Sequence, residues 1–148
     1  MLILDIATIF CVGLLIGNEF AVSAFVNPVL WKLDDSEQAS AIRLFAARLG
    51  SAMPFWYVLC FVLLVVETVL RHRESGFFLL LTASVIWAAV IVLTLLFLVP
   101  INNRMARLAS GSLAEQSRGE HKRWDKLHRI RVLALSGALI CFLVAIRL

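Results

Sequence analysis

The sequence contains few charged residues for its length. Only 16% of its 148 residues are charged, whereas 61% are hydrophobic. A soluble domain of this size usually has about a quarter of its residues charged and about half apolar. The composition therefore excludes an ordinary soluble domain and indicates a membrane protein.

Cysteine is scarce, and no Cys-x-x-Cys pair occurs. Cys11, Cys60 and Cys141 each fall within an apolar stretch. A membrane thiol oxidoreductase needs paired cysteines close to a surface. We therefore expect the three thiols to pack against other apolar groups.

Several motifs that carry chemistry in other proteins are missing as well. The chain has no Gly-x-Ser-x-Gly, no His-Glu-x-x-His and no glycine-rich phosphate loop, so nothing suggests a nucleotide or a flavin. One His, one Glu and a few amides do not make a usual zinc or haem site. We expect neither a metal nor a cofactor, and a weak site of one His and one carboxylate is the alternative.

Four apolar segments are long enough to cross a bilayer, which requires about 20 mostly apolar residues. They span about residues 3–26, 51–70, 77–99 and 130–148. No Lys or Arg precedes the first segment, so we expect a retained span rather than a signal peptide. Because lipid offers the backbone no hydrogen-bond partners, the sequence predicts one all-α domain over residues 1–148, a four-transmembrane-helix bundle.

The segment between the first two spans predicts a short amphipathic interfacial helix. Its acidic start, residues 34–37, suits a helix N-terminus, and Ile42 and Phe45 fall on one apolar side. Gly50 closes the segment before the second span. We expect this helix to lie on the membrane interface.

Basic residues are distributed very unevenly along the chain. Eleven of the 14 Lys and Arg residues lie in the first and third loops or the turn that follows, and three lie on the other side. By the positive-inside rule, loops 1 and 3 are cytoplasmic and both termini are outside. We expect an integral protein of a bacterial inner membrane, whose net charge of +4 reflects topology and contact with membrane lipid rather than nucleic-acid binding.

Two further patterns concern contacts between helices. Gly13 and Gly17 form a Gly-x-x-x-Gly in the first span, which allows another helix to approach closely, and this face is a candidate contact for a homo-oligomer. Glu67 and Arg71, four residues apart at the end of the second span, predict an ion pair at the surface.

Polar residues from separate segments gather at one depth of the predicted bundle. An ionisable group inside a bilayer is costly unless it is paired, so Glu19 in the first span is a candidate functional residue. We predict one shared polar pocket with Trp124 at its rim, lined by Glu19, His128, Arg131 and at least one of Asn102 and Asn103.

These side chains supply the parts of a proton-transfer site. Glu19 or His128 can accept a proton, Arg131 can stabilise an anion, and Trp124 offers an aromatic face. The candidate catalytic residues are Glu19, His128 and Arg131, and the candidate substrate-binding residues are Asn27, Asn102, Asn103, Arg104 and Trp124.

Each of these residues also has a purely structural interpretation. Glu19 could form an inter-helix hydrogen bond that fixes packing. Residues 102–104 could cap the third span after Pro100, and Trp124 and Arg131 could be interfacial anchors. The convergence of all of them on one side of the membrane favours the functional interpretation.

The order of these motifs resembles a large family of four-helix membrane proteins that includes the anthrone oxygenases. The resemblance covers essentially the whole chain and is carried by Glu19-Phe20, Asn27-Pro28, Pro100-Ile101-Asn102-Asn103-Arg104 and Trp124…His128…Arg131. It implies a cofactor-independent oxygenase that oxidises an anthrone to an anthraquinone.

Three function classes remain open from the sequence. The first is a membrane oxidoreductase that acts on a lipophilic anthrone- or phenol-like small molecule. The alternative is a small proton-coupled transporter, because a lone carboxylate in the first of four helices, here Glu19, also marks compact exporters. The third is a structural subunit without catalysis.

Overall fold

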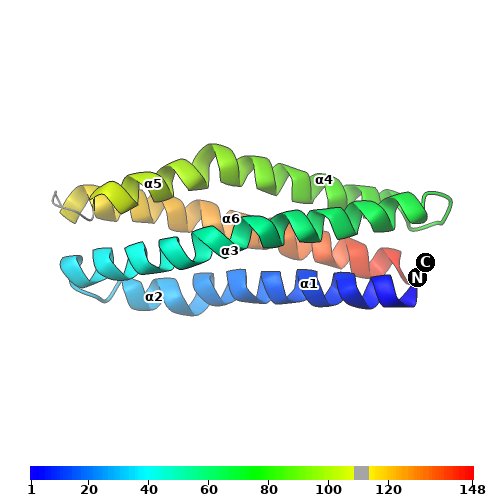
Figure 1. Ribbon diagram of the computed structural model, residues 1–148, viewed down its shortest axis with the longest axis horizontal. Helices are drawn as coiled ribbons and strands as arrows, with labels where there is room; N and C mark the ends of the chain where they lie inside the picture. Colours follow the sequence, from blue (N-terminus) through cyan, green and yellow to red (C-terminus); the bar gives the residue numbers. More distant parts are fainter. Residues whose placement is uncertain (109–113) are drawn as a thin grey trace.

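The computed structural model describes residues 1–108 and 114–148, with side chains for residues 1–105 and 118–148. These ranges fold into four long helical rods that run side by side (Figure 1). The rods comprise, in chain order, α1 (Leu2–Ala21) with the π-helical turn η1 (Val22–Val26) and α2 (Asn27–Leu30); α3 (Asp35–Leu70); α4 (Phe77–Leu93) with the π-helical turn η2 (Thr94–Leu98) and α5 (Val99–Leu108); and α6 (Ala114–Ala145).

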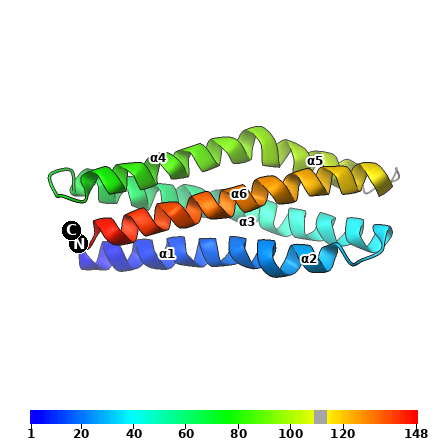
Figure 2. The ribbon, with the colours of Figure 1, turned by 180° about the vertical axis from the view of Figure 1, so that it is seen from behind.

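Both chain termini lie at one end of the bundle, beside the turn between α3 and α4 (Figure 1). We call this the terminal end. The opposite end, which we call the far end, carries the turn between α2 and α3. Seen from behind, α6 runs between the α1 and α4 rods (Figure 2), and it packs against both of them.

Each rod contains a helix long and apolar enough to cross a membrane. The apolar helices are Leu2–Leu30, Asp35–Leu70, Phe77–Met105 and Arg118–Ala145. Their lengths and compositions fit an integral membrane protein with four transmembrane helices. A helix of 36 residues such as α3 is about 54 Å long, which is longer than the hydrocarbon core of about 30 Å.

The separate amphipathic helix predicted between the first two spans is not present. α3 runs without a break from Asp35 to Leu70, through Gly50 and Pro54. A glycine inside a helix costs only about 1 kcal/mol, and the apolar side of this segment packs within the bundle. Its residue Ile42 belongs to a second apolar core at the far end, together with Leu30, Ile101 and Met105.

The same second core accounts for the length of the last two helical rods. The third rod continues as helix to Leu108, and α6 begins at Ala114, so both helices extend beyond the apolar segments at about 77–99 and 130–148. The main core, which includes Leu15, Trp87 and Phe142, fills the other half of the bundle. The rods therefore surround two apolar cores, which follow one another along the long axis of the bundle.

Each π-helical turn is followed by a proline at the same spacing. η1 ends two residues before Pro28, and η2 ends two residues before Pro100. Proline donates no hydrogen bond to the carbonyl four residues earlier, and its ring crowds that carbonyl. A wider π turn accommodates this crowding without ending the helix, so both rods continue past their prolines.

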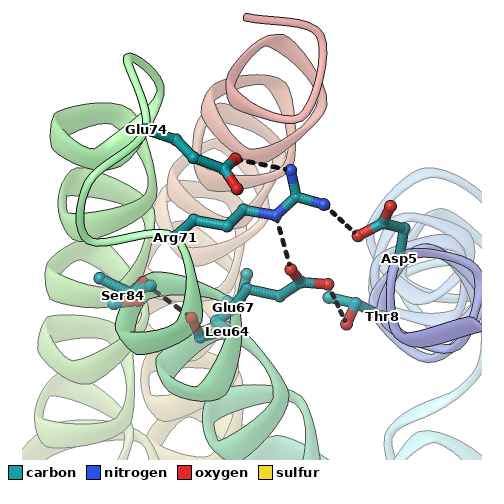
Figure 3. Close-up of polar contacts among 8 residues, drawn as sticks. Asp5, Thr8, Leu64, Glu67, Arg71, Glu74 and Ser84 are labelled. Carbon is teal, nitrogen blue, oxygen red and sulfur yellow. Dashed lines mark hydrogen bonds and ion pairs between the residues drawn. The ribbon is translucent and has the colours of Figure 1, made fainter. Parts of the chain in front are cut away.

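A buried ion-pair network ties the terminal end together (Figure 3). Arg71 Nη2 donates to Asp5 at 2.6 Å, Nε to Glu67 at 3.1 Å and Nη1 to Glu74 at 3.0 Å, and Thr8 donates to the other Glu67 oxygen at 3.3 Å. Glu67 and Arg71 are both buried. The predicted pair of Glu67 and Arg71 is therefore confirmed, but it is buried rather than at the surface, because Asp5 and Thr8 from α1 cover it.

Replacing Arg71 by Met should lower the free energy of unfolding by about 3–5 kcal/mol, because Glu67 would keep its buried charge without a cation. Unfolding in mixed micelles followed by circular dichroism measures this loss. Arg73→Met is the matched control, since Arg73 is exposed, and it should change stability by less than about 0.5 kcal/mol. Equal losses in the two variants would contradict the role of the network.

Candidate functional site

A cavity of about 270 Å³ lies inside the bundle, between the two apolar cores. All four rods contribute to its wall, which is mostly apolar. This volume lies near the lower limit for small-molecule pockets, roughly 300 Å³. Its polar or titratable lining residues are Glu19, Asn27, Tyr57, Thr94, Asn102, His121, Trp124, His128 and Arg131.

The centre of the polar wall is a cluster of Glu19, His128 and Arg131, all three buried. Arg131 Nη2 donates to Glu19 Oε2 at 2.5 Å and lies 2.9 Å from His128 Nδ1. His128 Nε2 lies 3.2 Å from the backbone carbonyl oxygen of Glu19. The guanidinium supplies the positive charge that a buried carboxylate requires.

These contacts place a proton on Nε2 of His128. A guanidinium has only donors and a carbonyl oxygen only accepts. Nε2 of His128 therefore carries a proton, which it donates to the backbone carbonyl of Glu19. Nδ1 lies 2.9 Å from Arg131 Nη2 and 3.3 Å from Glu19 Oε2, so it accepts from the guanidinium in the neutral imidazole and donates to the carboxylate in the protonated imidazole. In either form both ring nitrogens are engaged, and His128 holds Glu19 and Arg131 in register.

Arg131 also connects the cluster to the other rods. Its Nη1 lies 3.5 Å from the hydroxyl of Thr94, the first residue of η2, and its guanidinium carbon lies 5.5 Å from the centre of the Tyr57 ring on α3. Glu19 stands in the last turn of α1, directly before η1. One side chain on α6 therefore contacts residues at or beside both π-helical turns. Such turns occur frequently at functional sites.

A second polar group lies next to this cluster on the first rod and α6. Asn27 Nδ2 donates to Asp125 Oδ1 at 2.7 Å, and the other Asp125 oxygen pairs with Arg129 at 3.0 Å. Asn27 is buried and lines the cavity. Sequence reasoning did not single out Asp125, although its spacing of four residues from Arg129 was a usable signal.

Aromatic rings form a row that leads from the central cluster toward the far end. Trp124 stacks on His128 at 4.6 Å between ring centres, and His121 stacks on Trp31 at 4.4 Å. His121 and Trp124 lie 6.4 Å apart. Sequence reasoning missed His121, which is seven residues from His128 and so shares its helix face.

Four buried polar atoms at the cavity have no hydrogen-bond partner within the side chains that the structure describes. They are Tyr57 Oη, His121 Nε2, Trp124 Nε1 and Arg131 Nε, and all four residues line the cavity. The indole and guanidinium nitrogens are donors only. Leaving such a group buried and unpaired costs about 1–3 kcal/mol, so a ligand with hydrogen-bond acceptors would be favoured here.

The predicted site residues fall into two groups. Glu19, Asn27, Asn102, Trp124, His128 and Arg131 all line the cavity. Asn103 and Arg104 do not: both are exposed, and Arg104 pairs with Glu120 at 3.1 Å. Because α5 continues as a helix, each residue after Asn102 turns about 100° further around the axis, which carries these two side chains away from the cavity.

Comparison with known protein families decides the family of this chain. The family model of anthrone oxygenase matches residues 41–141. The chain belongs to the anthrone oxygenase family. No curated protein and no solved structure matches the chain.

The part matched by the anthrone oxygenase family model begins within α3 and ends within α6. It contains Tyr57, Trp124, His128 and Arg131 but not Glu19. The family match thus covers most of the polar cavity wall and leaves out the Glu19 carboxylate.

In this member of the anthrone oxygenase family, Arg131→Met should lower the free energy of unfolding by about 3–5 kcal/mol, because it leaves Glu19 charged and buried. Adding Glu19→Gln to the same chain should restore much of the loss, as measured by unfolding in mixed micelles. Arg104→Met is the control, and loss of its exposed pair should cost less than about 1 kcal/mol. A double variant no more stable than Arg131→Met would show that the carboxylate is not the cause.

Proposed function

We propose that the protein oxidises a lipophilic anthrone- or phenol-like molecule with O2 in this cavity, without a cofactor. The observation that carries the proposal is the set of unpartnered buried groups on Tyr57, Trp124 and Arg131, beside the Glu19 carboxylate in an otherwise apolar cavity. The match to the anthrone oxygenase family supports the class of reaction.

The cavity suits a flat, mostly apolar molecule with oxygen atoms on its edge. Its apolar walls would contact aromatic rings. The Tyr57 hydroxyl, Trp124 Nε1 and Arg131 Nε would donate hydrogen bonds to carbonyl or hydroxyl oxygens. A buried ligand without acceptors would leave these donors unpaired, which is the basis of strong discrimination by polar sites.

Glu19 is a better proton acceptor than His128 in this arrangement. Both nitrogens of His128 are engaged, by the Glu19 carbonyl and by Arg131. The His128 and Arg131 nitrogens that pair with the Glu19 carboxylate contact Oε2, whereas Oε1 has no such partner in the described ranges. We assign proton abstraction to Glu19 and the positioning of Glu19 and Arg131 to His128.

The proposed reaction uses O2 as its only oxidant. Glu19 takes a proton from the methylene carbon of an anthrone, and Arg131 stabilises the resulting anion. The electron pair on that carbon reduces O2 and forms a C–O bond, and the peroxide takes up the proton. Loss of the remaining hydrogen as a proton then breaks the O–O bond and forms the carbonyl. One anthrone and one O2 give one anthraquinone and one water.

Purified protein in liposomes should consume one O2 for each anthrone and release one anthraquinone, measured with an oxygen electrode and by absorbance. Glu19→Gln should lower the rate about 10²–10⁴-fold, the usual contribution of a positioned base. Arg104→Gln should keep the wild-type rate, since Arg104 lies outside the cavity. Wild-type protein that consumes no O2 across a panel of anthrones and phenols would refute the proposal.

The proposal also includes an orientation in which the far end is cytoplasmic, because Lys and Arg are concentrated there. In a chain whose three cysteines are replaced by alanine, His72→Cys should react with a membrane-impermeant maleimide on bacterial spheroplasts. Lys32→Cys should react only after permeabilisation. The reverse pattern would overturn the orientation and leave the helix bundle unaffected.

A further inference from the structure

We propose that the cavity takes its ligand sideways from the bilayer, through an opening between α3 and η2. The opening is bordered by Gly50, Pro54 and Val58 on α3 and by Leu95 and Val99 on the facing rod. We call it the lateral opening. This inference takes from the proposed function only the kind of molecule that enters, a lipophilic aromatic compound.

The exposure of the cavity-lining residues locates the opening. Lining residues of the first rod and of α6 are all buried or half-buried. Among the residues whose side chains are described, exposed lining residues occur only on α3 and the α4–η2–α5 rod, where Val58 is 53% exposed and Leu95 is 61% exposed. A side chain that borders both the cavity and the outer surface marks the place where the two meet.

The path of the third rod produces this opening. The rod bows away from its neighbours between α4 and α5, at η2 (Figure 1). α3 packs against α4 and α5 on either side of this bow but much less against η2 itself. The π turn before Pro100 is a known cause of such bends. The lateral opening therefore follows from the backbone as well as from side-chain positions.

Gly50 keeps one edge of the lateral opening clear. Gly50, Pro54 and Val58 are spaced by four residues, so they form one stripe, which is about 12 Å long at 1.5 Å per residue. A Cβ atom added at Gly50 would meet no other group within 4 Å. A large side chain at residue 50 would therefore fill free space at the opening without displacing the core.

The surface around the lateral opening is apolar. Phe55, Leu96 and Phe97 beside it are 75%, 63% and 45% exposed. These residues belong to helices of membrane-spanning length and hydropathy, so the opening faces lipid. A ligand on this route must be soluble in the bilayer and uncharged, and it becomes an anion only inside, beside Glu19 and Arg131.

The test measures ligand association in liposomes, with anthraquinone as the probe and quenching of tryptophan fluorescence in stopped flow as the signal. Gly50→Phe should slow association at least ten-fold relative to wild type. Gly119→Phe is the matched control, because Gly119 is also an exposed helical glycine with no group near an added Cβ, and it does not line the cavity. Its association rate should equal that of wild type.

A labelling experiment covers the case in which Gly50→Phe does not fold. In a chain without native cysteines, Gly50→Cys should react with an alkyl maleimide dissolved in the bilayer, and anthraquinone should slow that reaction. Gly119→Cys should react equally fast with and without anthraquinone. Lack of protection at residue 50 would overturn the lateral opening.

The outcomes separate this inference from the oxygenase proposal, because binding does not require turnover. Slower association in Gly50→Phe without any O2 consumption by wild type would keep the lateral opening and reject the oxidation. O2 consumption by wild type together with unchanged association in Gly50→Phe would keep the oxidation and reject the lateral opening. Absence of quenching in wild-type protein would refute the inference.

Discussion

The ion pair between Glu19 and Arg131 is the interaction on which the polar half of this structure depends. It joins α1 to α6 within an apolar interior, where either charge alone would be strongly destabilising. His128 contacts both partners, and Arg131 also contacts Thr94 and Tyr57 on the other two rods. The cavity is therefore built around the Glu19 carboxylate, whose negative charge is compensated by Arg131 from another helix.

The terminal end solves a similar problem in a different way. There, three carboxylates surround one guanidinium, and the carboxylates of Glu67 and Asp5 come from different rods. In that cluster each nitrogen of the Arg71 guanidinium already has a carboxylate partner, and its members do not line the cavity. At the central cluster, by contrast, one carboxylate oxygen and several donors remain available. The terminal cluster therefore serves to hold helices together, whereas the central cluster has groups left over to bind a ligand.

Hydropathy and charge predicted the four spans and the grouping of Glu19, His128 and Arg131, because both depend on position along a helix. Three features could not be predicted that way. His121 and Asp125 acquire their meaning from Trp31 and Asn27, which lie on other helices. Asn103 and Arg104 lie away from the cavity, because a helix that continues turns each next residue further around its axis. The length of the rods depends on the second core around Ile42, which exists only once the helices have packed.

The two π turns change the angular phase of their rods. In an α-helix, two side chains eight residues apart differ by about 80° in direction around the helix axis. A π turn contains roughly one extra residue, which reduces this difference to about 20°. Glu19 and Asn27 are eight residues apart across η1, and Thr94 and Asn102 are eight apart across η2. All four line the cavity. Each of these two rods thus has two polar side chains on the same face, about two helical turns apart. An unbroken α-helix of the same sequence would not align them in this way.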